Sequence, residues 1–393
     1  MGDIDLLRPV GLVGIPCAVM AKRGAMPRFS RYNRQTLEWG DAWQEPQRVL
    51  ELLIDFGRSQ PERPVLFYEH DAYLLLISRN RDQLAKYFRF VLPDPELVED
   101  IVDKIRFRDL AERAQLPVPR TQLLYSESAW MDVDLSFPFI IKPLLRSQPL
   151  WAPLAGMSKA VRINSAAELE EFRARNAAAE IDLLAQELVD GPESSIESYQ
   201  VYVDEGGKIA GEFTGRKIRT HPKTFGHSCS LEIADLPDTR ELGRRLARKL
   251  KLRGVAEFEF KRAPDGELFL LEVNSRFNLW HHVGAAAGVN IPAIVYADLI
   301  GQPRPEAKPA REGVRWLRPW QDFLSSRADG VPLMNWLRWA ADCEVKRGLS
   351  WDDPIAPLAG AAWRTGANLI NLIHPRPAVG REAFIALKSV KEE

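Results

Sequence analysis

Two neighbouring runs near the middle of the chain, Gly254–Lys261 and Leu268–Asn274, alternate between apolar and polar residues. This period of two predicts two β-strands, because successive side chains of a strand point to opposite faces. The Asp265-Gly266 pair between them predicts a two-residue type I′ hairpin turn, which needs positive φ at both central positions. In that register Glu259 lies directly opposite Glu272. The other face of the hairpin would be apolar and would hold Phe258, Phe260, Leu271 and Val273.

The opposed carboxylates of Glu259 and Glu272 would repel each other, since directly paired residues have Cβ atoms only about 5 Å apart. A bridging cation would remove this repulsion. Mg²⁺ suits the site because proteins hold it with one or two carboxylates together with substrate phosphates, and Asn274 adds a neutral oxygen on the same face. We therefore expect Glu259, Glu272 and Asn274 to bind Mg²⁺, or Mn²⁺ in its place. On the pattern alone, a solvated polar face on an edge hairpin is the alternative.

The N-terminal quarter of the chain mixes short strand patterns with helical ones. Strands are expected at Pro16–Met20 and Pro64–Tyr68, and helices at Gln47–Ser59 and Arg81–Phe90. Strands that alternate with helices favour a parallel sheet covered on both faces. No strand pattern is seen in Met1–Val10.

Proline-rich segments divide the chain into three parts. One boundary lies at Leu92–Pro95, and a second lies at Pro303, Pro305 and Pro309. The expected domains are residues 1–98, 99–302 and 303–393.

The third part is expected to be helical and is rich in tryptophan. Trp316 and Trp320, like Trp336 and Trp339, recur at spacings of three or four, which places each pair on one side of a helix. Tryptophan is favoured where a large apolar area meets a polar edge. We therefore expect a docking element, either onto the chain's own neighbouring domain or across a homodimer. The alternative is a membrane-surface helix, which the acidic residues of this part disfavour.

Composition excludes several classes of function. The net charge of -1 over 393 residues leaves no basic surface for nucleic acid, because binding to phosphates needs clustered Lys and Arg. Cys17, Cys229 and Cys343 are too few and too far apart for a disulfide framework or a structural zinc site. No apolar stretch approaches the roughly 20 residues that span a bilayer, and the N-terminus lacks a signal-peptide layout. We expect a soluble, cytoplasmic protein.

Further motifs occur in one order along residues 100 to 300. The run Glu272-Val273-Asn274-Ser275-Arg276, with Glu259 on the preceding strand, resembles the metal-binding end of ATP-grasp enzymes. The remaining motifs resemble the entry, the nucleotide-lysine strand, the adenine hinge and a basic strand of the ATP-dependent carboxylate-amine ligase subgroup. They are Asp103-Lys104 with Leu116–Thr121, Pro138–Pro143, Gln186–Gly191, and Thr214–Arg219 with Phe225-Gly226.

The resemblance implies an α/β fold. An N-terminal Rossmann-like domain would precede a two-lobed α+β ATP-grasp domain, and a helical C-terminal tail would follow. Such proteins usually begin with a strand that leads into a glycine-bearing turn. Since Met1–Val10 lacks that pattern, either the first strand is absent or the start of the chain is late.

The resemblance also implies a nucleotide site for ATP. Lys104 and Lys142 would contact its phosphates; the alternatives are an ordinary helix lysine and a strand-end lysine in solvent. Lys159 would contribute from a loop that folds over the phosphates, although this loop is poor in glycine and Lys159 is equally well a surface lysine. Glu193 would bind the ribose hydroxyls, with Glu197 as the runner-up. Adenine would receive backbone hydrogen bonds from Gln186, Glu187, Leu188 and Val189.

Cationic side chains supply the expected catalytic groups. By resemblance, Arg276 would contact the substrate carboxylate or the oxyanion that follows, for which its planar fork is suited. If the strand is regular, Lys217 and Arg219 share one face and Arg216 takes the other. That shared face is our candidate for binding the γ-phosphate and the acyl phosphate; the alternative is a solvated run of charges.

His281 and His282 are adjacent, so they cannot form the i,i+4 pair of a zinc helix. With Trp280 they would line the acceptor pocket or pack within it.

The implied reaction joins a small-molecule carboxylate to an amine. The carboxylate would attack the γ-phosphate of ATP to give an acyl phosphate, which the amine would convert to an amide, with release of ADP and phosphate. Two alternatives stay open. One is a thiol, bicarbonate or sugar-linked acceptor on the same scaffold, and the other is a nucleotide-binding protein without catalysis.

Overall fold

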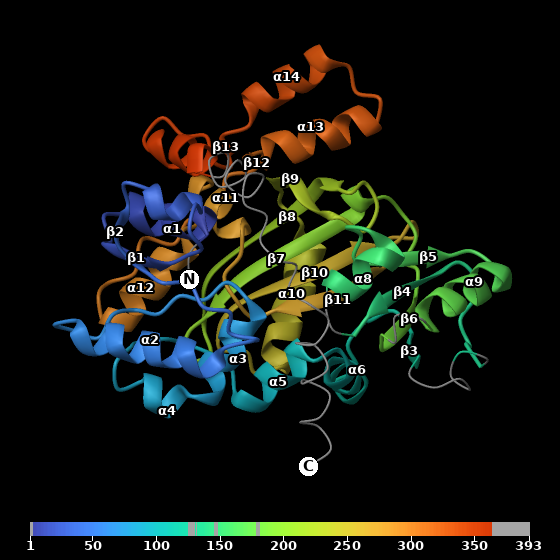
Figure 1. Cartoon of the computed structure of the whole chain (residues 1–393), viewed down its shortest axis with the longest axis horizontal. Coiled ribbons are helices and arrows are strands. Elements are labelled where there is room, and N and C mark those ends of the chain that lie inside the picture. Colours follow the sequence, from blue (N-terminus) through green and yellow to red (C-terminus); the bar gives the residue numbers. More distant parts are fainter. Residues whose placement is uncertain (1–2, 125–129, 131, 145–147, 178–180, 364–393) are drawn as a thin grey trace, which may run out of the picture.

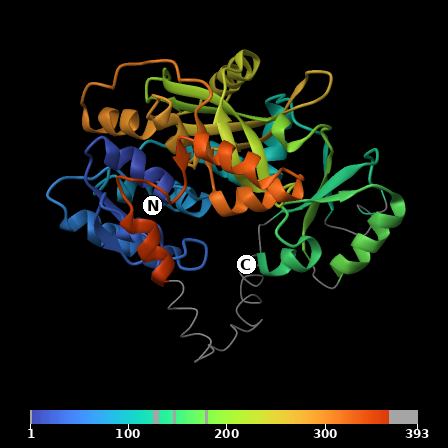
Figure 2. The ribbon, with the colours of Figure 1, turned by 90° about the horizontal axis from the view of Figure 1, so that it is seen from above.

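The computed structural model describes residues 3–124, 130, 132–144, 148–177 and 181–363. A seven-stranded and a four-stranded sheet, both mainly antiparallel, a small two-stranded sheet and a set of covering helices make up these residues. Both views place the N-terminal segment and a four-stranded sheet at opposite ends of the molecule, with a seven-stranded sheet between them (Figures 1 and 2).

The seven-stranded sheet forms the centre of the protein. Its strand order is β11-β10-β7-β8-β9-β12-β13, and only the pair β12 and β13 is parallel. Five of its strands come from the middle of the chain, and β12 and β13 come from the C-terminal part. The strands are β7 (Ile196–Val203), β8 (Ile209–His221), β9 (His227–Ile233), β10 (Gly254–Arg262), β11 (Leu268–Asn274), β12 (Arg315–Leu317) and β13 (Val345–Lys346).

The hairpin of β10 and β11 confirms the predicted pairing of Glu259 with Glu272, although the turn and the register near it differ from the prediction. The turn is not a two-residue type I′ turn. The N–H of Ala263 donates to the carbonyl of Glu267 at 2.9 Å, so three residues form the loop, and the last of them, Gly266, has φ +93°. A bulge in β11 then inserts Leu271 as an extra residue, which restores the predicted rung.

The bulge also changes which side chains form the apolar face. Leu270 is fully buried, whereas Leu271, predicted to lie in the core, is only half-buried. Phe258, Phe260 and Val273 are buried as predicted. They pack with Tyr199 and other side chains beneath α5 (Pro95–Val102), α6 (Lys104–Arg113) and α10 (Pro237–Lys249).

The four-stranded sheet is antiparallel, with strand order β3-β6-β4-β5. Its apolar face packs against the two helices α8 and α9 through Phe139, Ile141, Trp151 and Phe172. The elements are β3 (Thr121–Leu124), β4 (Phe139–Pro143), α8 (Gln148–Ala155), β5 (Val161–Ile163), α9 (Ala166–Ala177) and β6 (Leu183–Glu187).

The N-terminal segment is less regular than predicted. The strand and the helix expected at 16–20 and 47–59 are confirmed as β1 (Cys17–Met20) and α2 (Pro46–Ser59). The segment Pro64–Tyr68 forms only one isolated bridge, between Val65 and Arg89, and the helix expected at 81–90 ends at Leu84. The remaining elements are α1 (Ile4–Leu12), η1 (Met26–Phe29), β2 (Asn33–Leu37), α3 (Asp71–Arg79) and α4 (Arg81–Leu84).

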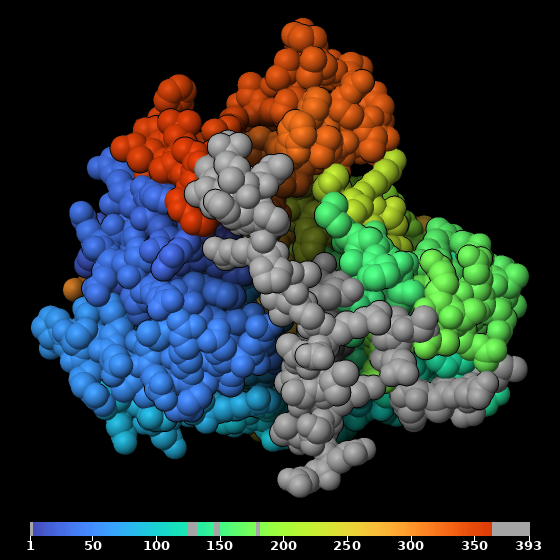
Figure 3. Space-filling model, in the orientation of Figure 1, coloured from blue at the N-terminus to red at the C-terminus, as the bar shows by residue number. Residues whose placement is uncertain are grey.

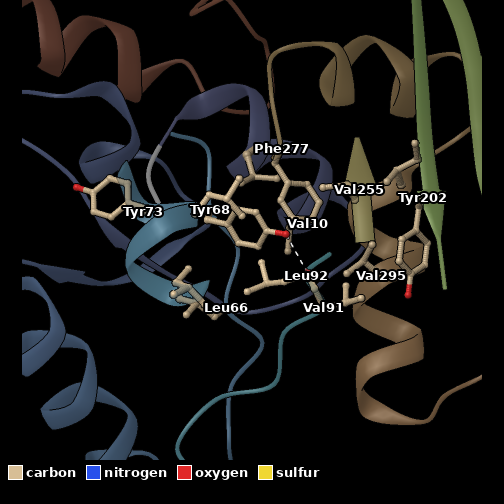
Figure 4. Close-up of a cluster of buried hydrophobic side chains, with 14 of the residues drawn as sticks. Val10, Leu66, Tyr68, Tyr73, Val91, Leu92, Tyr202, Val255, Phe277 and Val295 are labelled. Atoms are coloured by element: carbon tan, nitrogen blue, oxygen red, sulfur yellow. Dashed lines mark hydrogen bonds between the residues drawn. The ribbon is translucent and has the colours of Figure 1, made fainter. Parts of the chain in front are cut away.

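Within this described segment, β1 and β2 form a two-stranded parallel sheet. A broader Rossmann-like sheet is therefore not confirmed. Instead, the segment packs on the central sheet through one shared core, in which Tyr68 contacts Phe277 with ring centroids 5.7 Å apart and donates its hydroxyl to the Val91 carbonyl at 2.9 Å (Figure 4).

Helices α11 (Trp280–Ala286) and α12 (Ile291–Ile300) follow the central hairpin. Among the residues that the structure describes, no single helix is long and apolar enough to cross a membrane. These two helices meet that test only as a pair, and they are bent by 91° at their junction.

The C-terminal part is only partly helical up to residue 363, where the described residues end. It holds α13 (Pro319–Ala328) and α14 (Leu333–Asp342), which stand out at the top of the molecule (Figure 3). Trp316 was expected on a helix but lies in β12, where it pairs with Leu231 of β9 and is fully buried. The prediction was wrong here because the free edge of β9 lies far away in sequence.

The other tryptophans of this part differ in exposure. The indole N–H of Trp336 donates to Asp322 at 2.8 Å, and the Trp339 ring stacks under the guanidinium of Arg219 at 4.3 Å. Trp320 and Trp351 are exposed. The C-terminal part therefore docks onto its own chain, one of the two arrangements considered.

A buried polar network around Asp5 of α1 joins both ends of the described chain. Its carboxylate accepts from the Trp316 indole at 2.9 Å and lies 2.8 Å from Nδ1 of His282 and 2.9 Å from Nε of Arg347. Burial alone would raise the pKa of Asp5, but the His282 hydrogen bond and the charge of Arg347 outweigh it and lower the pKa. One carboxylate thus holds α1, α11, β12 and the segment after β13 together.

Trp316 and Trp351 offer a matched test of this docking. Replacing a fully buried aromatic side chain by alanine costs about 3–5 kcal/mol, so we expect Trp316→Ala to lower the unfolding free energy by that amount. Trp351→Ala, at a fully exposed position, should change it by less than about 0.5 kcal/mol. Urea denaturation followed by circular dichroism measures both. Equal stability of the two variants would contradict the docked arrangement.

Candidate active site

Three glutamates crowd one face of the central sheet. Glu257 and Glu259 follow each other on this face of β10, and Glu272 lies opposite Glu259 on β11. Glu257 and Glu259 are buried, at 6% and 8% exposed, and Glu272 is half-buried. The sequence prediction used two of these carboxylates and missed Glu257, although the same alternation places it on the same face.

Glu257 is held by neutral donors. One carboxylate oxygen accepts from the Ser198 hydroxyl at 2.9 Å, and the other accepts from the amides of Asn278 at 3.1 Å and Asn274 at 3.4 Å. Burial, with the charges of Glu259 and Glu272, raises the pKa of Glu257 to about 7. Burial is the larger of these causes, and the two neighbouring carboxylates add to it.

Lys217 of β8 is the cation closest to this cluster. Its ammonium lies 2.7 Å from Glu259, and both side chains are almost fully buried. Burial by itself would lower the pKa of Lys217, but Glu259, Glu272 and Glu257 outweigh it and raise the pKa. Lys217 thus lies where the sequence predicted a phosphate-binding cation, next to the predicted metal ligands.

Arg276 closes the other side of the cluster. Its Nη2 donates to the Asn274 amide oxygen at 3.0 Å, and its Nε donates to Asp71 at 2.6 Å. Asn274 in turn donates to Glu272 at 2.9 Å. Asp71 begins α3 of the N-terminal segment and lies 205 residues from Arg276, so no local sequence signal pointed to it.

The predicted sharing of one face by Lys217 and Arg219 is wrong. A bulge in β8 makes Ile218 an extra residue, so Lys217 and Arg219 occupy successive rungs and point to opposite faces. Arg219 forms a two-pronged ion pair with Asp322 of α13, at 2.8 Å on both prongs. Arg216 lies beside Glu232. Arg219 therefore holds the C-terminal part and is not carried into our catalytic set.

The residues expected at the phosphates and adenine lie on the four-stranded sheet and beside it. The Lys142 ammonium of β4 donates to the Gln186 side chain of β6 at 2.8 Å, and the Lys104 ammonium of α6 donates to the Pro143 carbonyl. Gln186 donates in turn to Thr121 at 3.0 Å. Glu187 ends β6, and Leu188 and Val189 follow it.

Lys159 and Glu193 flank this group. The backbone N–H of Lys159 donates at 2.9 Å to the carbonyl of Phe225, which lies in the turn between β8 and β9, so this end of the loop contacts a turn of the large sheet. Part of the loop is helical as α8, whereas Ser147 lies outside the described residues. Glu193 begins η2 (Glu193–Ser195). Glu197 is on the opposite face, where both its carboxylate oxygens bind Arg262, which removes it as the runner-up for ribose.

The two histidines are occupied by structural contacts. His282 is bound to Asp5. His281 accepts from the Asn278 backbone N–H at 3.0 Å and packs on Phe277, and burial lowers its pKa to about 4. Packing, one of the two roles considered, describes both.

The oxygen donors suit a hard divalent cation. Among the described residues, no three His, Cys, Asp or Glu side chains are grouped as a metal site. The predicted set instead combines two carboxylates, Glu259 and Glu272, with the amide oxygen of Asn274, and Mg²⁺ commonly completes such a set with phosphate oxygens. A cation here would relieve the repulsion that Glu259 and Glu272 add to the burial of Glu257.

One surface cavity, lined by described residues, is separate from this site. It has a volume of about 520 Å³ and lies between the N-terminal segment and the β7–β8 hairpin. Its lining includes Arg63, Arg89, Tyr202 and Arg304, and none of the predicted site residues.

Comparison with known proteins agrees with this geometry. Residues 180–319 match a family described as ATP-grasp in the biosynthetic pathway with Ter operon. D-aspartate ligase of Enterococcus faecium is 24% identical over 314 residues, which cover 77% of this chain and 72% of that protein. D-alanine–D-alanine ligase of Pseudomonas putida is 25% identical over 218 residues, 50% of this chain and 63% of that protein.

A solved structure shares the fold. The biotin carboxylase domain dimer of 2-oxoglutarate carboxylase from Hydrogenobacter thermophilus, in complex with MgADP, ADP and bicarbonate, has a TM-score of 0.59 at 17% identity, over 80% of this chain and 71% of that chain. At this identity the likeness concerns the fold alone. The resemblance of the motifs to ATP-grasp proteins agrees with the family match over residues 180–319, and the findings support an ATP-dependent ligase of the ATP-grasp type, homologous to carboxylate-amine ligases.

The crowding around Glu257 predicts a pH effect on stability. Because its pKa rises from an ordinary 4.5 to about 7 on folding, the stabilisation is fully present below the ordinary pKa and is lost as the pH rises through about 7. Glu257→Gln should remove this loss. With EDTA present, we expect the unfolding free energy of the wild type to fall more than that of the variant between about pH 5 and pH 8, by on the order of 1–3 kcal/mol.

Melting curves recorded across this pH range measure the effect. Glu205→Gln, at an exposed position, is the matched control and should follow the wild type. Parallel pH profiles for the wild type and Glu257→Gln would show that Glu257 does not titrate in this range.

Proposed function

We propose that the protein joins a small-molecule carboxylate to an amine through an acyl phosphate, with consumption of ATP. The observation that carries this proposal is the arrangement on β8, β10 and β11. Two opposed carboxylates, Glu259 and Glu272, lie on one face together with two cations. The buried Lys217 and Arg276 flank the carboxylates, so a phosphate could contact these two side chains directly. Such a face can bind a polyphosphate through a divalent cation and its own cations together.

The proposed reaction has two steps. A carboxylate oxygen of the first substrate attacks the γ-phosphorus, and the bond from that phosphorus to the β,γ-bridging oxygen breaks to release ADP. The amine nitrogen then attacks the acyl carbon, the carbon–oxygen bond to phosphate breaks, and the amine loses a proton. An amide and inorganic phosphate result.

The chain's own residues would mainly position and stabilise charge. Arg276, fixed by Asp71 and Asn274 through Nε and Nη2, keeps Nη1 to donate to the substrate carboxylate. Lys217 would stabilise the transferred phosphoryl group, and Lys142 and Lys104 the remaining phosphates. Glu259, Glu272 and Asn274 would hold Mg²⁺, or Mn²⁺, which neutralises phosphate charge when bound. Water must be excluded, because it would hydrolyse the acyl phosphate.

The adenosine half of ATP would lie against the four-stranded sheet. Backbone groups of residues 186–189 would bind adenine, and Glu193 would bind ribose. Because ATP is the co-substrate, we infer a cytoplasmic location. The named relatives act on D-aspartate or D-alanine, so amino acids are the first carboxylates and amines to test.

Phosphate release with pooled substrates tests the reaction. With ATP and Mg²⁺, we expect release only when a carboxylate pool and an amine pool are both present. Glu272→Ala should reduce the rate by on the order of 100-fold or more, because it removes one of two opposed carboxylates. Glu267→Ala, at an exposed position on the same hairpin, should not.

Other outcomes would redirect the assignment. Release that requires a thiol, bicarbonate or a sugar-linked acceptor would change the acceptor, and ATP binding without turnover would leave a nucleotide-binding protein. Full activity of Glu272→Ala would refute the metal assignment.

Lys142 separates phosphate binding from nucleoside binding. If its ammonium contacts phosphate, Lys142→Ala should weaken ATP about 10- to 100-fold, as expected for a lost charge-assisted hydrogen bond. Adenosine, which has no phosphate, should lose much less. Calorimetric titration of both ligands, with Lys249→Ala as an exposed control, decides the matter. Equal losses for ATP and adenosine would indicate a packing role for Lys142.

A further inference from the structure

Lys261 is a buried lysine on the active face of β10. The ladder between β10 and β7 is regular from Gly254 to Lys261, so alternation places Lys261 on the same face as Glu257 and Glu259. Its residue surface is only 6% exposed. Phe258 and Phe260, on the other face, belong to the hydrophobic core. Lys261 therefore does not point into solvent beside the sheet.

The ammonium of Lys261 has no hydrogen-bond or ion-pair partner among the described residues. Lys217 is comparably buried but lies 2.7 Å from Glu259. Burial lowers the pKa of Lys261, although the carboxylates of Glu193 and Asp190 act against this shift. Buried lysines are almost always paired, because an unpaired charge in the interior is costly. A partner that is absent from the chain itself would resolve this cost.

The charges around Lys261 lie on both sheets. Glu193 and Asp190, which follow β6, and Arg162 of β5 belong to the four-stranded sheet and its hinge, and Lys217 of β8 is a further charged neighbour on the large sheet. Along β10, Lys261 is two residues beyond Glu259, about 7 Å at the usual rise of a strand. This displacement leads away from Glu257 and Arg276 and toward the hinge.

We propose that Lys261 is a ribose-binding residue that donates a hydrogen bond to the hydroxyl oxygens of the bound nucleotide, opposite Glu193. The proposal rests on the nucleotide site described under the proposed function. A ribose diol both donates and accepts hydrogen bonds. A carboxylate can only accept from it, so Glu193 leaves the hydroxyl oxygens without a donor. An ammonium beside Glu193 supplies that donor, and the nucleotide supplies the partner that Lys261 lacks.

If the ammonium of Lys261 binds the ribose hydroxyls, removing either group should weaken nucleotide binding, and removing both should weaken it little further. The full-length wild-type protein, Lys261→Met and the exposed control Lys208→Met are titrated by calorimetry with MgADP and with the magnesium salt of 2′,3′-dideoxy-ADP. We expect Lys261→Met to bind ADP about 10- to 100-fold more weakly than the wild type. For dideoxy-ADP, both proteins should bind equally within about twofold, because the atoms that Lys261 contacts are missing. Lys208→Met should match the wild type with both ligands.

A melting curve without nucleotide separates this role from a structural one. The melting temperature of Lys261→Met should be equal to or above that of the wild type, since the variant buries an apolar side chain in place of an unpaired charge. If Lys261→Met does not fold, Lys261→Gln provides the same comparison of ADP with dideoxy-ADP.

Two results would overturn the proposal. Unchanged ADP affinity in Lys261→Met would show that the ammonium does not contact the nucleotide, and equal weakening of ADP and dideoxy-ADP would place the contact on phosphate or base. Failure of the proposed function itself would be recognised separately, because the wild-type protein would then not bind ADP.

Discussion

Repulsion among three carboxylates held in register by strand pairing is the constraint around which the site is built. Backbone hydrogen bonds between β10 and its neighbours β7 and β11 fix Glu257, Glu259 and Glu272 on one face, whatever their charges. Lys217 of β8 pairs with one of these carboxylates, and the amides of Asn274 and Asn278 donate hydrogen bonds to the others. Arg276, just past β11, donates to Asn274. Burial, together with the charges of Glu259 and Glu272, still raises the pKa of Glu257. A cation held between Glu259 and Glu272 would relieve their repulsion, and the flanking lysine and arginine could bind an anion beside it.

The same constraint explains why distant parts of the chain meet near the site. Arg276 reaches back to Asp71, so the N-terminal segment fixes the guanidinium that the substrate would meet. A few residues further on, Phe277 packs on Tyr68, and His282 binds Asp5 beside Trp316. The stretch from β11 through α11 therefore passes directly from the reactive face into the core shared by both ends of the described chain. Disturbing that core is expected to shift Arg276 as well as to reduce stability, because packed interiors transmit displacement.

The local sequence pattern was sufficient to predict the strands of the ATP-grasp part and the Glu259–Glu272 pair, since period-two alternation and an Asp-Gly turn are encoded by neighbouring residues. The prediction of strand register failed where a bulge inserts one extra residue. The bulge at Leu271 cancelled an error in the turn, whereas the bulge at Ile218 reversed the face of Arg219. Alternation alone does not reveal a bulge, because the extra residue is set by the partner strand. The partners Asp71 and Asp322, and the strand position of Trp316, depend on contacts 85 or more residues away. Such contacts leave no periodic signal in one sequence.

Lys217 and Lys261 show how a ligand-binding face differs from a hydrophobic core in the pairing of its buried charges. Both are buried on the same side of the central sheet, and burial penalises the charge of both. One is paired within the protein, and the other has no partner among the described residues. If stability alone had shaped this face, an apolar residue at 261 would remove the penalty at no cost to the strand, which already buries Phe258 and Phe260 on its other side. Residues that violate a local rule without compensation inside the protein are expected where a ligand completes the arrangement. The distribution of paired and unpaired charges along β10 would therefore follow the proposed nucleotide, from the candidate metal-binding carboxylates to the hinge.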